Sequence, residues 1–202
     1  MFLFDIQPDQ IDDLQSVLVQ ENAQLNYLSP MVRASLEKVN GKAFQSKNDE
    51  APVTREQERQ QHIRRHIYNL SYRTELSNAE YIVSGKALTK NYDWESTVPA
   101  EVSLEQKFSE RRGLKLGDLL TFNVQEIEVE AKVVNLRRIK WNSFQPNFFI
   151  LFQTGVLEDA PATFLASLGG LDKTRRMQLQ NLIVKEFPNV SVIDVTRMVK
   201  RV

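Results

Sequence analysis

The sequence contains no cysteine in its 202 residues. Disulfides, zinc–thiolate sites and thiol nucleophiles are therefore all excluded. The sequence also lacks an excess of either charge, because 26 basic residues offset 26 acidic residues. A chain with zero net charge has no basic surface of the kind that holds phosphate backbones, so nucleic acid is not an expected partner.

Long apolar runs are missing as well. No window reaches the roughly 20 consecutive apolar residues that a membrane-spanning helix needs. The first residues do not follow the basic-then-apolar order of a signal peptide, because Met1 is followed at once by the apolar run 2–6. Such a start suits a fragment of a larger protein, although an ordinary cytosolic protein could begin in the same way. We expect these 202 residues to be soluble by themselves.

Recognised catalytic motifs are absent too. The sequence has no G-x-S-x-G, phosphate-binding G-x-x-x-x-G-K or dinucleotide-binding G-x-G-x-x-G. Its two histidines, His62 and His66, have the spacing of a metalloprotease helix, but Ile63 takes the place of the required glutamate. Arg64 and Arg65 lie between them and would repel a divalent cation. We predict no metal site.

Two other patterns have simple structural explanations. Ser35 and Lys38 match the S-x-x-K spacing of acyl enzymes, but a strand is expected there, and residues three apart in a strand point to opposite faces. Glu126, Glu128 and Glu130 are expected on the solvent face of one strand. We therefore predict no catalytic residues and no cofactor, and an enzyme of unrecognised type stays a minor alternative.

The N-terminal end predicts a strand, a helix and a second strand. Residues 2–6 form a short apolar run. Apolar residues then recur three, four and seven positions apart over residues 8–21, with Pro8 in the first turn, which predicts an amphipathic helix. The apolar run 31–39 ends at the turn dipeptide Asn40-Gly41 and predicts a strand.

The C-terminal end predicts the same order. A strand is expected over 163–168, a helix from about Asp172 to Pro188, and a strand over 190–195. Two strand–helix–strand units separated by a long insertion are what a split ferredoxin-like layer requires.

The insertion predicts strands and one short helix. Ser103 to Gln106 match a capping box, and the helix that follows is expected to end at Gly113. Strands are expected over 118–124 and over 126–133, where charged and apolar residues alternate. The fold class is thus α+β: residues 1–42 and 145–202 form the ferredoxin-like lobe, residues 43–69 a variable polar insertion, and residues 70–144 a smaller β-rich lobe.

Five aromatic residues gather in the segment 140–152. In an extended chain, Phe148 and Phe152 share one face and Phe149 the other, so both faces are apolar and burial on both is expected. Trp141 and Phe144 differ, because polar residues surround them as in a loop. We predict that these two aromatics are a candidate contact for a partner or an apolar molecule.

An ordered set of short phrases resembles the periplasmic domain of the MacB/FtsX-like bacterial ABC transporter permeases, in the YbbP-type branch. The match extends over nearly the whole chain and is weakest over 43–60. Departures are Lys140, Asn142 and Gln145 around the tryptophan, and Gln153-Thr154 where proline is common. The phrases are Asp5-Ile6-Gln7-Pro8-Asp9-Gln10, Pro30-Met31-Val32-Arg33, Asn40-Gly41-Lys42, Asn69-Leu70-Ser71-Tyr72-Arg73, Val83-Ser84-Gly85, Val102-Ser103-Leu104-Glu105, Leu116-Gly117-Asp118, Leu136-Arg137, Trp141, Pro146-Asn147-Phe148-Phe149 and Gly155-Val156-Leu157-Glu158-Asp159-Ala160-Pro161-Ala162-Thr163.

The resemblance implies a MacB-type periplasmic core domain on the periplasmic face of the bacterial inner membrane. Membrane helices of the full-length permease would flank it, and the residues from Thr196 onward would begin one of them. ATP hydrolysis would belong to a separate cytoplasmic ABC subunit. The expected function is to transmit ATP-driven movement to an envelope substrate or partner, such as a lipid, a lipoprotein or a periplasmic hydrolase. The alternative is a free-standing binding or scaffold module for an envelope lipid or protein.

Overall fold

The computed structural model describes residues 1–44, 67–140 and 145–194. His62, His66, Trp141, Phe144 and the segment from Thr196 onward lie outside these ranges. The described chain divides into two compact units. The first unit comprises residues 1–31, 145–146 and 161–194, and the second comprises residues 32–44, 67–140 and 147–160.

Both ends of the chain contribute strands to one antiparallel sheet in the first unit. Its order is β11 (Ser191–Ile193), β1 (Phe2–Ile6), β10 (Thr163–Leu168) and the first part of β2 (Leu25–Val39). Each neighbouring pair is antiparallel. The predicted strands at both ends of the chain are therefore confirmed, with β2 beginning six residues earlier than expected.

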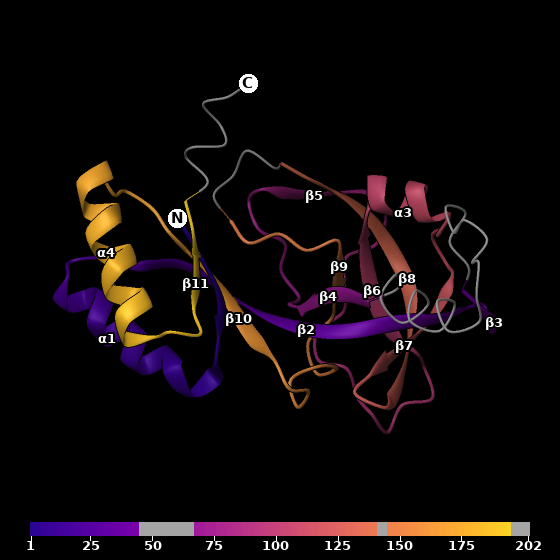
Figure 1. Cartoon of the computed structure of the whole chain (residues 1–202). Helices are drawn as coiled ribbons and strands as arrows, with labels where there is room; N and C mark the ends of the chain where they lie inside the picture. Colours follow the sequence, from indigo (N-terminus) through magenta and orange to yellow (C-terminus); the bar gives the residue numbers. More distant parts are fainter. Residues whose placement is uncertain (45–66, 141–144, 195–202) are drawn as a thin grey trace, which may run out of the picture. The chain divides into compact units, whose positions relative to one another are not determined.

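Two helices cover one side of this sheet (Figure 1). The helix α1 (Ile11–Gln20) follows a short 3-10 turn at Pro8–Gln10, and α4 (Lys173–Glu186) begins after Asp172, whose carboxylate accepts a hydrogen bond from the Arg175 amide. Their apolar residues meet the strands in a shared core, which confirms both predicted helices. The buried members of this core include Leu3, Ile6, Leu14, Leu18, Ala166, Leu168, Leu179 and Ile183.

The second unit contains a closed ring of six strands. The later part of β2 pairs with β4 (Ile67–Tyr72), which pairs with β9 (Ile150–Phe152). From β9 the pairing continues through β6 (Ala100–Glu105), β8 (Ile127–Ile139) and β7 (Leu119–Val124), and β7 returns to β2. A closed ring leaves none of these strands with a wholly unpaired edge. Two further strands attach to the ring: β5 (Glu80–Gly85) pairs with β8, and β3 (Lys42–Ala43) pairs with β2.

The short helix α3 (Gln106–Arg112) follows β6 directly and ends at Gly113, as predicted. The predicted capping box at Ser103 is wrong. Ser103 lies inside β6, and Glu105 is the N-cap, its carboxylate accepting from the Phe108 amide at 2.7 Å. Pairing of β6 on both sides continues through these residues, which moves the helix start two positions downstream of the predicted cap.

The strand β8 carries the alternation expected from the sequence. Val129, Ala131 and Val133 are buried, whereas Glu128 and Glu130 are exposed. The strand continues well past residue 133, where its pairing with β6 shifts by one residue, and Asn135 and Arg137 beyond this shift are polar and buried. These two side chains form part of the polar cluster described below.

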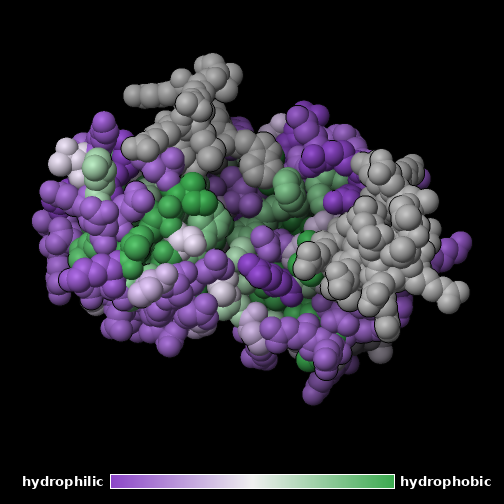
Figure 2. All heavy atoms as spheres, in the orientation of Figure 1, coloured by the Kyte–Doolittle hydropathy of each residue, from purple (hydrophilic) through white to green (hydrophobic). Residues whose placement is uncertain are grey.

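The division between the two compact units falls after Met31, within β2, which is one strand of 15 residues that supplies both units. On the face drawn in Figure 2 the surface is mostly hydrophilic, and apolar side chains come to the surface in limited areas. Among the residues that the structure describes, no helix has the length and apolar character needed to cross a membrane.

Candidate functional site: a buried charge cluster and an exposed tryptophan groove

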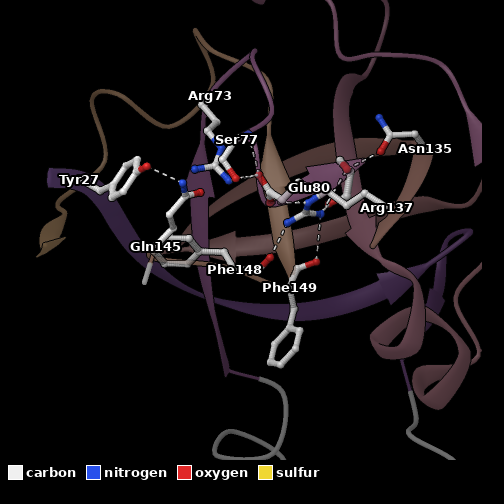
Figure 3. Close-up of polar contacts among 10 residues, drawn as sticks. Tyr27, Arg73, Ser77, Glu80, Asn135, Arg137, Gln145, Phe148 and Phe149 are labelled. Atoms are coloured by element: carbon white, nitrogen blue, oxygen red, sulfur yellow. Dashed lines mark hydrogen bonds and ion pairs between the residues drawn. The ribbon is translucent and has the colours of Figure 1, made fainter. Parts of the chain in front are cut away.

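A charge cluster lies inside the second unit, around Arg137 of β8. The Arg137 side chain has no exposed surface, and its Nε donates to the Glu80 carboxylate at 3.0 Å. Its two Nη atoms donate to the backbone carbonyls of Ser103 (2.9 Å), Phe148 and Phe149 (Figure 3). One guanidinium therefore joins three strands to the segment that precedes β9.

Glu80, at the start of β5, completes the pairing. Its second carboxylate oxygen accepts from Arg73 and from the amide and hydroxyl of Ser77, both at 3.0 Å. Burial alone would raise the pKa of Glu80, but the charges of Arg137 and Arg73 outweigh burial and hold that pKa below its ordinary value. Glu80 thus stays ionised inside the protein.

Ser103 and Asn135 extend the cluster. The Ser103 hydroxyl bonds to the Asn135 side-chain oxygen, and the Asn135 amide donates to the Lys86 carbonyl at 2.8 Å. Both side chains are buried. The Glu80 and Arg137 side chains have no exposed surface, and Arg73 is the partly exposed member of the cluster, so the geometry favours a structural role for the Glu80–Arg137 pair.

Two residues of the aromatic stretch, Phe148 and Phe149, contribute backbone carbonyls to this cluster. Phe148 and the β9 residues 150–152 are buried, which confirms the predicted core. Phe149 is a correction, because its ring is 38% exposed. It points away from the charge cluster (Figure 3), stacks on Phe108 with centroids 5.4 Å apart, and lies under the Arg111 guanidinium. The helix α3 thus covers one face of Phe149 and leaves the rest to solvent.

The second unit also has an open groove of about 250 Å³. One wall is the loop between β5 and β6, which presents Trp94 (58% exposed) and Val98 (64% exposed). The other wall is the solvent face of β8, with Glu128 and Glu130. An apolar wall therefore faces an acidic wall.

The loop that carries Trp94 is fixed at several points. The Trp94 indole Nε1 donates to the Gly155 carbonyl at 2.9 Å, and its ring meets Tyr92 edge to face at 5.2 Å. The Tyr92 amide donates to the Thr154 carbonyl at 2.7 Å, and its hydroxyl donates to the Val98 carbonyl at 3.1 Å. The exposed tryptophan is therefore held in place.

A second anchor fixes the start of the same loop. The Glu101 carboxylate accepts from the Thr89 amide at 2.7 Å and from Lys86 at 2.5 Å, and these contacts outweigh the effect of burial and hold its pKa below the ordinary value. The Gln153 side chain accepts from the Glu101 amide at 2.5 Å. Gln153 and Thr154, noted above as departures from the family pattern, thus anchor the groove.

The residues predicted as a contact site, Trp141 and Phe144, lie outside the described residues and stay a prediction. Their neighbour Gln145 donates a hydrogen bond to the Tyr27 hydroxyl at 2.5 Å within the first unit. Trp94 was not singled out from the sequence. The criterion applied to Trp141, an aromatic residue among polar loop residues, also selects Trp94 in Asn91-Tyr92-Asp93-Trp94-Glu95-Ser96.

No group of three or more His, Cys, Asp or Glu side chains is placed to hold a metal ion in residues 1–44, 67–140 and 145–194. The second unit presents to solvent an aromatic groove and a partly exposed aromatic stack on α3, and both are suited to contact with another molecule.

Comparison with known proteins relates the chain to a transporter permease. No family model matches the chain. The chain is 29% identical over 201 residues to the uncharacterized ABC transporter permease YbbP of Escherichia coli strain K12. The resemblance to YbbP-type permeases is confirmed. The match covers 100% of this chain but only 22% of YbbP, so the chain corresponds to about a fifth of that permease.

Solved structures give two further similarities. The periplasmic region of MacB from Actinobacillus actinomycetemcomitans aligns with a TM-score of 0.47 and 10% identity, over 100% of this chain and 92% of that one. A domain of a putative permease from Porphyromonas gingivalis aligns with a TM-score of 0.35 and 8% identity, over 83% of this chain and 73% of that one.

Proposed function

We propose that this chain is the periplasmic domain of a YbbP-type ABC transporter permease, and that it transmits ATP-driven movement of the membrane helices to an envelope substrate or partner. The observation that carries the proposal is the similarity to a permease along the whole chain. The two compact units, each with its own core, support it, because separate cores allow one body to move against another.

The proposal includes the organisation of the domain. The order β11-β1-β10-β2, with every pair antiparallel and two helices on one side, supports a ferredoxin-like first unit built from both chain ends. The closed ring and α3 would be the inserted lobe. In this arrangement the two ends of the chain belong to one unit, so movement of flanking membrane helices would act on that unit first.

The proposed partners are a cytoplasmic ABC ATPase that supplies the energy and an envelope lipid, lipoprotein or hydrolase that receives the movement. The domain itself would not be catalytic, which agrees with the burial of the Glu80–Arg137 pair, whose side chains have no exposed surface. The proposed location is the periplasmic face of the inner membrane.

The periplasmic location can be tested by labelling a single introduced cysteine. Because this region contains none, a single Glu126→Cys substitution in the full-length permease, with any cysteines elsewhere replaced, creates one site on an exposed turn. A membrane-impermeant maleimide should label this site in intact spheroplasts. Labelling only after the membrane is broken would overturn the periplasmic location.

The movement needs a separate test. Spin labels at Ser16, on the solvent side of α1, and at position 126 place one probe in each unit. In the full-length permease with its ATPase, the distance distribution between the labels should change when ATP is added, and a non-hydrolysable analogue should hold one of the two states. An unchanged distribution throughout the cycle would favour the free-standing binding module instead.

A further inference from the structure

We infer that the Trp94 groove binds an arginine-bearing basic segment of another protein. The groove is the open space of about 250 Å³ between the Trp94 loop and the solvent face of β8. The inference concerns this surface only, and it holds whether or not the domain moves with a transport cycle.

The charge of the groove selects the class of partner. Its lining includes two carboxylates, Glu128 and Glu130, and no basic residue. Lys38 pairs with Glu128 at 2.9 Å and also attracts Glu130 electrostatically, but the Glu130 side chain makes no ion pair or hydrogen bond with the residues that the structure describes. An anionic lipid or a phosphate would meet repulsion here, and a wholly apolar ligand would bury a carboxylate without a partner.

The apolar wall selects the side chain. A cation attached to an apolar stem can lie over the Trp94 ring and reach a carboxylate at its far end. Arginine fits best, because its planar guanidinium stacks on aromatic rings and donates two parallel hydrogen bonds to one carboxylate. Val98 extends the apolar wall and suits a neighbouring aliphatic residue of the same segment.

The groove is already shaped for such a ligand. Trp94 is held by its bond to Gly155 and by Tyr92, and the loop is anchored at Glu101, Gln153 and Thr154. A fixed loop loses little conformational freedom on binding, so even a small contact area can give measurable affinity. A single exposed tryptophan is common on protein surfaces. Trp94 differs because it is rigidly held and faces an unpaired carboxylate across a groove.

The test is a titration followed by NMR of the tryptophan indole groups. The chain has two tryptophans, and a Trp141→Phe variant leaves the Trp94 indole as the single signal. The probe is the peptide acetyl-Leu-Arg-Leu-Arg-amide, and the matched peptides carry citrulline or glutamate in place of arginine. The arginine peptide should shift the Trp94 signal at micromolar to millimolar concentration, and the citrulline peptide should bind about tenfold more weakly because it lacks the charge.

Two variants of the protein distinguish binding in the groove from attraction of the peptide by the net charge of the protein. Glu130→Gln should weaken binding of the arginine peptide about tenfold, whereas Glu126→Gln, which removes an exposed carboxylate outside the groove lining, should leave it unchanged. Both positions are exposed, and circular dichroism checks that the fold is kept. Equal weakening by the two variants would overturn the inference, because it would show attraction by net charge alone.

Two further outcomes would also overturn it. The first is an unchanged Trp94 signal with the arginine peptide at millimolar concentration. The second is a response to phosphatidylglycerol vesicles that exceeds the response to the arginine peptide, since that would make an anionic lipid surface the preferred ligand.

Discussion

Arg137 is the residue whose loss should cost the second unit most. It has no exposed surface and makes bonds to Glu80, to Ser103 and to the carbonyls that precede β9. Removing one partner of a buried ion pair leaves the other charge uncompensated, which typically costs about 3–5 kcal/mol.

Arg137→Met should therefore lower the free energy of unfolding by about 3–5 kcal/mol, measured by urea denaturation. The neighbouring Arg138 provides the control, because it is exposed and bonds to Gln106 on the surface. Arg138→Met should change stability by about 0.5 kcal/mol or less. If the two variants were equally stable, the buried cluster would not be important for stability.

Glu80 should make the free energy of unfolding depend on pH in the acidic range. Its pKa is held below the value of about 4.3 that glutamate has in an unfolded chain. The unfolded state therefore takes up a proton first as pH falls, so the stability that Glu80 contributes is complete at neutral pH and is lost below about pH 4.3.

The comparison that isolates this effect uses Glu80→Gln. The variant should be less stable than the wild type at pH 7, and the difference should narrow as urea denaturation is repeated at lower pH, below about pH 4.3. Glu126→Gln, at an exposed position, should follow the wild type throughout. A difference that stays constant with pH would show that the Glu80 pKa is not lowered.

The sequence carries a signal for this cluster in the alternation of β8. Val129, Ala131 and Val133 are the buried positions of an alternating strand, and the same spacing in the sequence selects Asn135 and Arg137, which are buried too, although the pairing of β8 with β6 shifts by one residue between Val133 and Asn135. Polar residues at inward positions require buried partners. The identity of those partners could not be predicted, because Glu80 and Ser103 are more than 30 residues away in the chain.

At the scale of elements, Gly85 beside β5 and Gly117 beside β7 have similar backbone conformations but differ in the space around their Cα atoms. Gly85 ends β5 with φ +92°, and Gly117 precedes β7 with φ +91°. Both conformations are unfavourable for other residues. They differ in available space: a Cβ on Gly85 would lie 2.1 Å from the Val134 carbonyl oxygen, whereas a Cβ on Gly117 would have no neighbour within 4 Å.

Gly117→Ala should cost about 1 kcal/mol, from backbone conformation alone. Gly85→Ala should cost about 1–3 kcal/mol more, because the new methyl group meets main-chain atoms of β8 that cannot move without disturbing the pairing. Urea denaturation of both variants measures the difference. Equal losses would mean that β5 moves away from β8 at little cost.

Elements with a local signal were predictable, and those that depend on distant pairing were not. Three signals act within a few residues, and each predicted the element beside it. They are the N-cap Asp172 before α4, the turn Asn40-Gly41 after β2, and the alternation of β8. Closure of the ring depends on β9, a strand of three residues that lies parallel to β4 and antiparallel to β6. Three residues carry no periodicity, so the sequence predicted their burial but not their neighbours.

At the scale of the whole molecule, the two units have separate cores although β2 supplies both. The core of the first unit joins α1 and α4 to β1 and β10. The charge cluster belongs wholly to the second unit. The elements of the two units should therefore be able to open independently, as separate cooperative groups.

Hydrogen exchange measured by mass spectrometry tests this independence. Arg137→Met should accelerate amide exchange in β4, β6 and β8 by about a hundredfold or more, since 3 kcal/mol corresponds to that factor, while exchange in α4 and β10 should stay unchanged. Asp172→Ala is the reciprocal control: it removes the cap of α4, costs about 1 kcal/mol and should accelerate exchange in the first unit alone. If Arg137→Met accelerated exchange in α4 by the same factor as in β8, the two units would unfold as one, and a movement of one against the other would need a source other than their separate cores.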